Sequence, residues 1–470
     1  LQTLSAQNEM IPKRANNSTV PLTQAQQRMF FLYKLDNTSS AYNMTFGLEI
    51  SGELDQSKLI NAIKESVAAH SILNSVVADE DGENYLQFAP NMVPAIEMSE
   101  VYDDDISLQT LKKNLFEKNY RRNINLENGP TVFIELVKYQ KTTSLLYFTA
   151  HHIFFDGLSF DLLSKEILSR YFDSPQQTSH GINFEDYAVW QKNTEKNTTS
   201  LAFWEDRLLG IPQCHSLPLD RERKPEISPK GCFYKPAFEH ELYVSLKMTA
   251  AELGVSLFSL LHSAYSLTVA LWSRQDDIVT GVPVSGRQNK QLQNVVGMFA
   301  NTLVYRAQFD FSKSFSETVK QQHQLHLDGL SHQSTVLEDI VAKVQPNRSM
   351  DHTPLFQLFF NLLTVEEYNQ NDDLLKFKPI AVDGFNMDSK FDLSINFIEQ
   401  TTLEICWDFD QNLFDESSIR QLHAGLIAIL RTVVADPDIS LKKINISNND
   451  IPIEIAQSDC QSTFSKQHEK

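Results

Sequence analysis

The chain has 470 residues, of which 41% are hydrophobic and 21% are charged, so it can form large cores and wholesale disorder is excluded. Its 15 glycines and 17 prolines are too few for a collagen-like or low-complexity chain. The 41 basic and 60 acidic residues give 41 − 60 = −19, and this charge disfavours a nucleic-acid partner, whose phosphates would be repelled. No apolar run reaches the ~18 residues that cross a bilayer, so no membrane partner is expected.

Hydrophobic periodicity predicts strands and helices along the first 180 residues. In chain order the predicted elements are a polar linker over 1–20, a helix after Pro21, a strand over 44–50, a helix ending near His70, strands over 132–136 and 145–148, and a helix after Gly157. Polar stretches at 173–181 and 192–200 then interrupt the pattern. We therefore place a domain boundary between about 175 and 200.

A similar pattern returns in the second part of the chain. Its predicted elements are a strongly apolar helix over 257–271, strands over 278–284, 302–307, 355–363, 394–398 and 403–409, and a last helix over 417–434. Strands and long helices mixed in both parts predict an α/β (α+β) fold. The two predicted subdomains cover 21–180 and 181–445, and a polar C-terminal linker covers 446–470.

The sequence HHIFFDG, residues 151–157, lies between a predicted strand and a predicted helix. A histidine in such a loop can face a cleft and move protons near neutral pH. Adjacent residues of an extended segment point to opposite faces, so at least one of His151 and His152 should be structural. Asp156 could hold the loop or an imidazole, and Gly157 permits a tight turn, a close backbone approach or a positive φ. A zinc site is the alternative, but Asp156 is the one close acid and no cysteine lies near.

Motifs of several other chemistries are missing. The sequence has no G-x-S-x-G elbow, no G-x-x-x-x-G-K-[ST] phosphate loop and no G-x-G-x-x-G dinucleotide loop, so an enzyme of this sequence would act on an already activated substrate. Its four cysteines form no C-x-x-C pair, which disfavours a zinc ribbon or a disulfide scaffold and favours a reducing, cytoplasmic setting. No signal peptide is visible over residues 1–10, and the missing initiator Met predicts a fragment of a longer protein.

HHIFFDG resembles the H-H-x-x-x-D-G motif of condensation domains of nonribosomal peptide synthetases, which belong to the chloramphenicol-acetyltransferase-like superfamily. Six more segments resemble the family's motifs in the expected order: PLTQAQQRMFFL (21–32), NFEDYAVWQ (183–191), GVPVSGR (281–287), VVGMFANTLVYR (295–306), SHQSTVLE (331–338) and RSMDHTPLFQLFFN (348–361). The resemblance covers about residues 20–445, and six ordered segments argue against a chance match.

The resemblance implies two acetyltransferase-like subdomains arranged as a V with a central tunnel. It also implies an acyltransferase that forms an amide bond between a donor acyl or peptidyl thioester and an acceptor aminoacyl thioester. Both substrates would be held on phosphopantetheine arms of carrier proteins, an upstream donor carrier and a downstream acceptor carrier, with adenylation or other synthase domains adjoining. No cofactor or metal bound by the domain itself is expected.

The resemblance also implies roles for single residues. His152 matches the family's catalytic histidine, a base or hydrogen-bond partner of the acceptor amine, and His151 is expected to support the loop. Asp156 matches an aspartate that forms a structural ion pair with an arginine, here Arg287, and a carboxylate paired in this way is a poor base. Gly157 matches a position whose backbone lies near the reacting centre.

Three more residues are expected at the substrate tunnel. Asn361 matches a polar tunnel residue, and the equal alternative is a strand-end side chain that bonds backbone. Gln26 and Arg28 are expected to have structural roles near the tunnel, against the alternative of solvation on a helix surface or a local salt bridge.

The chain departs from the family pattern in two places. Leu158 stands where the family often has Trp, and AHSILN (69–74) keeps His70 and Leu73 but lacks the arginines and the acid of R-H-E-x-L-R. These departures put a charge network near the first subdomain in doubt.

The subtype and the competing functions follow from the same motifs. The opening motif and the Trp190-Gln191 pair resemble the subtype that joins an L-configured donor to an L-configured acceptor (LCL), and the intact His151 disfavours the cyclising subtype. One competing function is a stand-alone acyltransferase that uses a soluble amine or alcohol. Another is a non-catalytic docking module, a kind of relative that tends to lose this motif. A third is an epimerising relative, for which no matching acid is identified.

Overall fold

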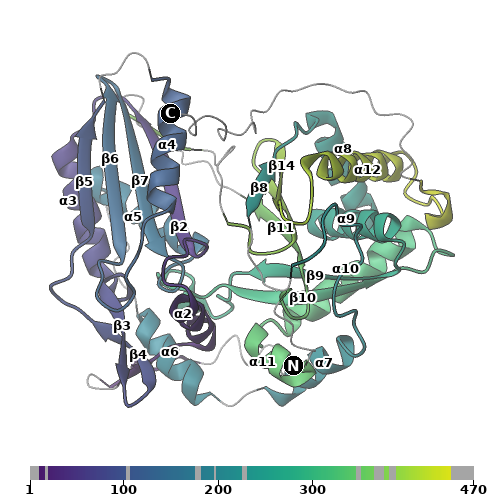
Figure 1. Cartoon of the computed structure of the whole chain (residues 1–470), viewed down its shortest axis with the longest axis horizontal. Helices are drawn as coiled ribbons and strands as arrows, with labels where there is room; N and C mark the ends of the chain where they lie inside the picture. The colour runs from purple at the N-terminus through teal and green to yellow at the C-terminus, as the bar shows by residue number, and fades with distance from the viewer. Residues whose placement is uncertain are drawn as a thin grey trace, which may run out of the picture.

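The computed structural model describes residues 10–15, 19–101, 106–174, 181–194, 197–224, 230–345, 351–364, 375–380 and 388–445. The predicted C-terminal linker and much of the predicted N-terminal linker lie outside these residues, as do parts of the polar stretches near 175–200 and residues 348–350 of the last motif. Two groups of elements, each built on a large sheet, stand beside each other (Figure 1). We name them the first half and the second half.

The first half is built on a five-stranded sheet of order β12-β2-β7-β6-β5. Its strands are β2 (Asn43–Ser51), β5 (Ala95–Glu100), β6 (Val132–Gln140), β7 (Thr143–His151) and β12 (Lys376–Pro379), all antiparallel to their neighbours except the parallel pair β5 and β6. Helices α3 (Gln56–Ala69) and α5 (Gly157–Tyr171) pack on one face and α4 (Leu108–Tyr120) on the other. Alternation along β7 explains both layers, because Phe148 faces α3 and α5 while Tyr147 faces α4.

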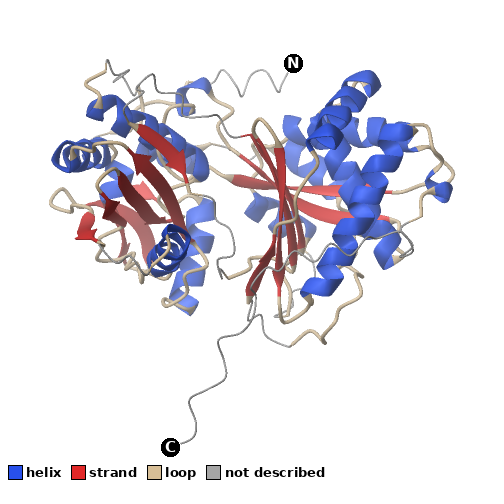
Figure 2. Cartoon of the chain, turned by 90° about the horizontal axis from the view of Figure 1, so that it is seen from above, coloured by secondary structure: helices blue, strands red, loops and turns tan. Residues whose placement is uncertain are grey.

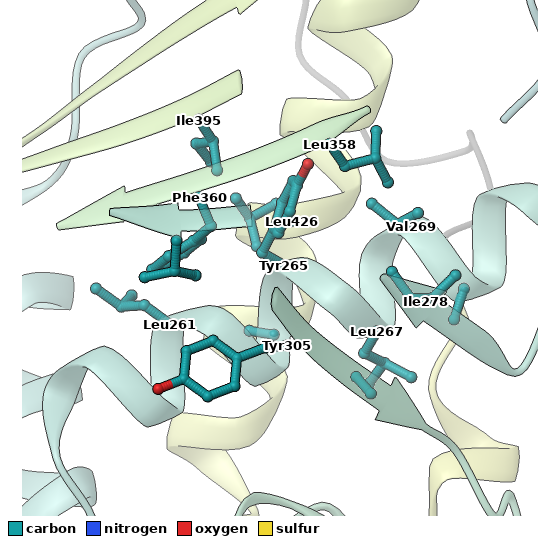
Figure 3. Packing of buried hydrophobic residues seen from close by; sticks show 14 of the residues in the cluster. Leu261, Tyr265, Leu267, Val269, Ile278, Tyr305, Leu358, Phe360, Ile395 and Leu426 are labelled. Carbon is teal, nitrogen blue, oxygen red and sulfur yellow. The ribbon is translucent and has the colours of Figure 1, made fainter. Parts of the chain in front are cut away.

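The second half is built on a six-stranded sheet of order β10-β9-β11-β13-β14-β8. Its strands are β8 (Gly231–Tyr234), β9 (Asp277–Val284), β10 (Asn301–Gln308), β11 (Leu358–Thr364), β13 (Leu393–Glu399) and β14 (Leu403–Asp410). Helices α8 (His240–Leu253), α9 (Leu257–Ser273), α10 (Phe315–Ser331) and α12 (Glu416–Ala435) cover one face. Every residue of α9 from Ser259 to Ala270 is buried, as expected of a helix that is apolar on all sides. Figure 3 shows its Tyr265 packed among side chains of the sheet and of α12.

The sheet of the second half, and not its helices, faces the first half (Figure 2). Side chains alternate along β14, so Trp407 and Phe409 lie in the core while Cys406 and Asp408 lie on the opposite face, partly exposed. Register places Asn361 of β11 beside Asn396 of β13, and Asn396 beside Cys406. A polar row therefore lines the side of this sheet that is turned toward the first half.

Several smaller elements complete the fold. They are β1 (Val20–Pro21), β3 (Ser75–Glu80) and β4 (Glu83–Phe88), which form a sheet of order β1-β4-β3, the helices α2 (Gln24–Leu35), α6 (Phe184–Asn193), α7 (Thr198–Arg207) and α11 (Leu337–Val344), and three short 3-10 helices at Ser71–Asn74, Lys290–Leu292 and Leu441–Lys443. The apolar residues of 292–299 and Phe184 of α6 lie in the core of the first half. Together with β12, they belong in space to the first half although the sequence division at 180 places them in the second subdomain.

The helices and strands predicted from periodicity are present in the structure. Several boundaries differ: β6 continues to Gln140 beyond its predicted end at 136, and β11 begins at Leu358 and not at the predicted 355. Leu355 has a φ of 70°, which an extended strand does not allow. In the described residues no helix by itself meets the length and hydropathy of a membrane span, and α8 and α9 meet them only as a pair that is bent by 104°.

Candidate active site

The HHIFFDG loop connects the end of β7 to the start of α5. His151 is the last residue of β7 and pairs with Asn43 of β2. The next residues turn tightly, because the Phe154 and Phe155 amides donate to the carbonyls of His151 and His152 at 3.1 and 3.3 Å. Both phenylalanine side chains are fully buried and anchor the turn in the core of the first half. Both phenylalanines therefore have a packing role, as is expected of large aromatic side chains.

Within the part of the chain that the structure describes, one ring nitrogen of His152 has no hydrogen-bond partner. Its Nδ1 lies 2.7 Å from the Phe155 carbonyl, and its backbone amide donates to the Tyr42 carbonyl at 2.8 Å. A carbonyl only accepts, so Nδ1 carries the proton and Nε2 of the neutral ring carries the lone pair. The pKa of His152 is lowered to about 4, first by burial and then by the positive charge of Lys390. At neutral pH the half-buried ring is therefore an uncharged hydrogen-bond acceptor.

His151 points to the other side of the strand end, as the alternation predicts. Its side chain is buried, and its Nδ1 accepts a hydrogen bond from the Ile153 amide at 3.1 Å. Burial lowers the pKa of His151 to about 3, with smaller contributions from His152 and Lys390. His151 is therefore neutral and takes part in shaping the loop.

Asp156 and Arg287 form the predicted ion pair. The two guanidinium nitrogens of Arg287 lie 2.7 and 3.0 Å from the two carboxylate oxygens, and both side chains are at most 3% exposed. Asp156 is also the N-cap of α5, because its carboxylate accepts from the Ser159 amide at 2.8 Å, and it accepts from the Phe299 amide at 3.0 Å. Four donors thus surround the carboxylate, and these hydrogen bonds fix the start of α5.

Arg287 ties this loop to the second half of the sequence. Besides Asp156, it donates to Ser159 Oγ at 2.8 Å and to the Val295 carbonyl at 3.2 Å. Its guanidinium also lies 4.3 Å from the centroid of the Phe299 ring. The arginine that follows β9 therefore fixes the start of α5 in place.

Gly157 is exposed at the first position of α5. A Cβ at this position would meet no protein atom within 4 Å. The φ angle of Gly157 is not positive, so a left-handed backbone conformation does not explain why glycine occurs at this position. Open space beside the first turn of the helix agrees with the expected close approach of another molecule.

Gln26 and Arg28 are both on α2 but differ in surroundings. Gln26 is fully buried, and its Nε2 donates to the Ile153 carbonyl at 2.8 Å while its Oε1 accepts from the Thr23 amide at 3.0 Å. It therefore holds the loop from behind, which is a structural role, and that this role lies near a tunnel stays a prediction. Arg28 is exposed and forms an ion pair at 3.2 Å with Glu338 of α11, which links α2 to the elements of the second half.

Asn361 lies in the polar row of the second sheet. Its Nδ2 donates to Asn396 Oδ1 at 3.3 Å. The partner is thus a side chain, whereas the alternative to a tunnel residue predicted a hydrogen bond to the backbone. It faces toward the first half, and within the described residues it forms no hydrogen bond with the histidine loop. A tunnel between the halves stays a prediction.

Sequence reasoning identified neither Tyr42 nor Lys390 as a site residue. Tyr42 precedes β2 and supplies the carbonyl that binds the His152 amide. The Nζ of Lys390, which precedes β13, lies 5.2 Å from the centroid of the Tyr42 ring. These residues are far from 151–157 in sequence, so only the folded chain brings them there.

One group of side chains in the described residues has the spacing of a metal site. Cys214, His215 and Asp392 present atoms within 4.8 Å of one another. Arg223 already donates to the same carboxylate at 2.5 and 3.2 Å. A cation there would meet the guanidinium charge, so the donor set fits a metal poorly.

Comparison with known proteins relates the chain to one family. A family model described as "Condensation domain" matches residues 16–450. Tyrocidine synthase 3 of Brevibacillus parabrevis is 29% identical over 430 residues, which are 91% of this chain and 6% of that protein. The chain thus spans a small part of the curated relatives it matches.

Two solved structures share the fold. The X-domain in "Complex of the X-domain and OxyB from Teicoplanin Biosynthesis" superposes with a TM-score of 0.81 at 18% identity, covering 94% of this chain and 99% of that one. The four-domain nonribosomal peptide synthetase AB3403 superposes with a TM-score of 0.80 at 20% identity, covering 95% of this chain and 35% of that one.

Proposed function

The chain belongs to the condensation domain family, and from that premise we propose that its HHIFFDG loop is a working active site. The function of such a domain in a nonribosomal peptide synthetase is peptide-bond formation between substrates held on carrier proteins. The observation that carries our proposal is the free Nε2 of His152, which is fixed by two backbone hydrogen bonds at the end of β7.

The reaction needs no nucleotide, because a thioester is already activated. The amine nitrogen of the acceptor forms a bond to the carbonyl carbon of the donor, and the π electrons of the carbonyl move to its oxygen. When this tetrahedral intermediate collapses, the C–S bond breaks and the thiolate of the donor arm leaves. One proton must leave the nitrogen on the way.

We assign to His152 the role of acceptor for that N–H. A ring whose pKa is about 4 is a weak base toward a free ammonium group, but its lone pair can orient the neutral amine. Once the nitrogen is bonded to the carbonyl carbon it is far more acidic, and the proton can then pass to Nε2. His152 acts in this proposal first as a hydrogen-bond acceptor and only late as a base.

The remaining site residues position this group. Asp156 and Arg287 fix the start of α5, while Gln26 and His151 hold the loop. The space beside Gly157 allows the thioester to approach the first turn of α5, whose free N–H groups favour a developing oxyanion.

The partners follow from this chemistry. We propose that an upstream carrier presents the donor and a downstream carrier presents the acceptor, each on a phosphopantetheine arm, with an adenylation domain in the same assembly. The LCL subtype also remains a proposal. The intact histidine loop favours catalysis over a docking role.

A carrier-loading assay tests the proposal. A donor-loaded carrier is mixed with an aminoacyl-loaded acceptor carrier, and intact-protein mass spectrometry follows the mass of the acceptor. We expect His152→Ala to slow transfer by roughly 10²- to 10⁴-fold, the usual contribution of a positioned acid or base. His240→Ala is the matched control, because His240 is exposed on α8.

The outcomes separate the competing functions. Equal rates in wild type and His152→Ala would keep condensation but remove His152 from the chemistry. Transfer to a soluble amine without any acceptor carrier would favour a stand-alone acyltransferase. Absence of transfer with several substrate pairs, together with tight binding of a non-carrier protein, would favour a docking module.

A further inference from the structure

Helix α2 contacts the histidine loop on one side and α11 on the other. Successive residues of an α-helix turn by about 100°, so Gln24 and Arg28 share one face and Gln26 projects from the opposite face. Gln26 Nε2 donates to the Ile153 carbonyl at 2.8 Å, directly beside His152 in the chain. The other two residues instead reach α11, which lies next to α2 (Figure 1). One helix of the first half therefore touches both the histidine loop and an element of the second half.

Two polar contacts join α2 to α11. Gln24 Nε2 donates to Asp339 Oδ1 at 3.1 Å, and Arg28 Nε lies 3.2 Å from Glu338 Oε1. The Arg28 side chain is 42% exposed and that of Glu338 is 22% exposed, so solvent screens the ion pair in part. Both contacts depend on direction, because each sets a donor nitrogen against an acceptor oxygen. They therefore fix how α2 sits on α11 more closely than apolar contacts would.

The two helices belong to different cores. Phe30 of α2 is buried in the core of the first half together with Ile153. Leu337 and Ile340 of α11 are buried in the core of the second half. The Leu337 amide also donates to Asn301 Oδ1 of β10 at 3.1 Å, which ties the first turn of α11 to the second sheet. A displacement of the second half against the first therefore reaches α2 through α11.

The histidine loop has little freedom to absorb such a displacement. Ile153 is fully buried, and its carbonyl is held by Gln26. The neighbouring His152 is fixed by its amide on the Tyr42 carbonyl at 2.8 Å and by its Nδ1 at 2.7 Å from the Phe155 carbonyl. A tilt of α2 that moves the Ile153 carbonyl would change the direction of His152 Nε2. Misplacement of a reacting group by about 1 Å can slow a reaction roughly 10²-fold.

We propose that Glu338 and Asp339 are positioning residues for His152, on which they act through α2. The arrangement of the two halves then sets the direction of His152 Nε2, and the loop has its productive geometry only while α11 holds α2. The proposal deepens the proposed function and rests on it for turnover, because His152 is the residue that meets the acceptor amine.

Turnover kinetics test this role. In Glu338→Ala, Asp339→Ala we expect kcat to fall roughly 5- to 150-fold, the usual size of a coupling between two sites, with unchanged KM for both loaded carriers. The reversed pair Arg28→Glu, Glu338→Arg should recover part of the rate that either single reversal loses. Lys343→Met is the matched control and should keep the wild-type kcat, because Lys343 of α11 pairs at 3.1 Å with Glu205 of α7, within the second half.

Hydrogen exchange tests the coupling without turnover. The four amides of residues 152–155 all donate hydrogen bonds inside the loop or to Tyr42. Their exchange should become roughly 5- to 150-fold faster in Glu338→Ala, Asp339→Ala, while that of β13 and β14 stays as in wild type. A contact that merely stabilises the fold would speed exchange in both regions, and that result would overturn the positioning role.

The two assays separate this inference from the proposed function. Faster exchange confined to the loop of the double variant, with no condensation by wild type, would support the coupling and overturn the proposed function. A raised KM at unchanged kcat would make α11 a carrier contact and overturn the positioning role, as would unchanged kcat and exchange together. If the double variant melts at a lower temperature, Arg28→Met at its exposed position decides: lower kcat with faster loop exchange supports the role, and wild-type values overturn it.

Discussion

Removal of the Arg287 side chain tests the most fully enclosed interaction of the active site. In Arg287→Met the Asp156 carboxylate would lose both guanidinium hydrogen bonds, at 2.7 and 3.0 Å, and keep only the amides of Ser159 and Phe299. Breaking a buried pair by removing one partner costs about 3–5 kcal/mol, because an uncompensated charge stays behind. Both side chains are at most 3% exposed, so solvent cannot screen that charge.

Hydrogen exchange of the two remaining amides measures this cost at the site itself. The Ser159 and Phe299 amides both donate to Asp156, so their exchange reports local opening of the loop. A loss of 3–5 kcal/mol corresponds to an exchange rate roughly 10²- to 10⁴-fold higher. Urea unfolding of the same variants gives the global free energy for comparison.

A double-mutant cycle completes this prediction. Asp156→Asn with Arg287→Met should cost less than the sum of the single variants, with a coupling of about 0.5–3 kcal/mol. Arg431→Met is the control, since its ion pair with Glu239 is more than half exposed on both sides and should be worth less than about 1 kcal/mol. Additive single effects, or an Arg287→Met cost no larger than that of Arg431→Met, would refute the reasoning.

Two further predictions concern the loop support and the core of the second half. Gln26→Met should lower the free energy of unfolding by about 1–3 kcal/mol and lower the transfer rate, because the buried Ile153 carbonyl loses its donor. In the control variant Gln27→Met, at an exposed position, the same urea titration should show a change of less than about 0.5 kcal/mol. Burial lowers the pKa of His262 to about 3. The unfolded chain therefore takes up a proton below pH 6.5 that the folded chain refuses. The contribution of His262 to stability is complete above pH 6.5 and should fall by about 2 kcal/mol at pH 5, in addition to the falls that the lowered pKa values of His151 and His152 cause in the same direction. His262→Gln should flatten that dependence, and an unchanged slope would contradict the assignment.

Local pattern predicted the elements that position the site but not the contacts between them. The strand, loop and helix around 151–157 follow from periodicity, and the opposite directions of His151 and His152 follow from the alternation of an extended chain. The partner of Asp156 came from a family motif, because Arg287 is 131 residues away and no spacing rule connects the two.

The contacts that sequence reasoning missed join segments that are far apart in the sequence. Lys390 reaches the histidine pair only because the segment before β13 is attached to Ser40 and Tyr120. The family resemblance predicts a structural role near the tunnel for Gln26, against the alternative of solvation on the helix surface. In the fold its amide satisfies a buried carbonyl, which periodicity cannot reveal.

The low basicity of His152 is consistent with the chemistry assigned to it. A more basic ring would be protonated part of the time near pH 6.5 and would then offer no lone pair to the amine. Burial and the charge of Lys390 keep the ring neutral throughout this range, at the cost of a weaker base. That cost is small when the substrate is a thioester, because bond formation itself makes the nitrogen acidic. The rate of transfer should therefore stay constant from pH 6 down to about pH 5 as far as His152 is concerned, and a fall centred near pH 6.5 would show that the imidazole is not held neutral.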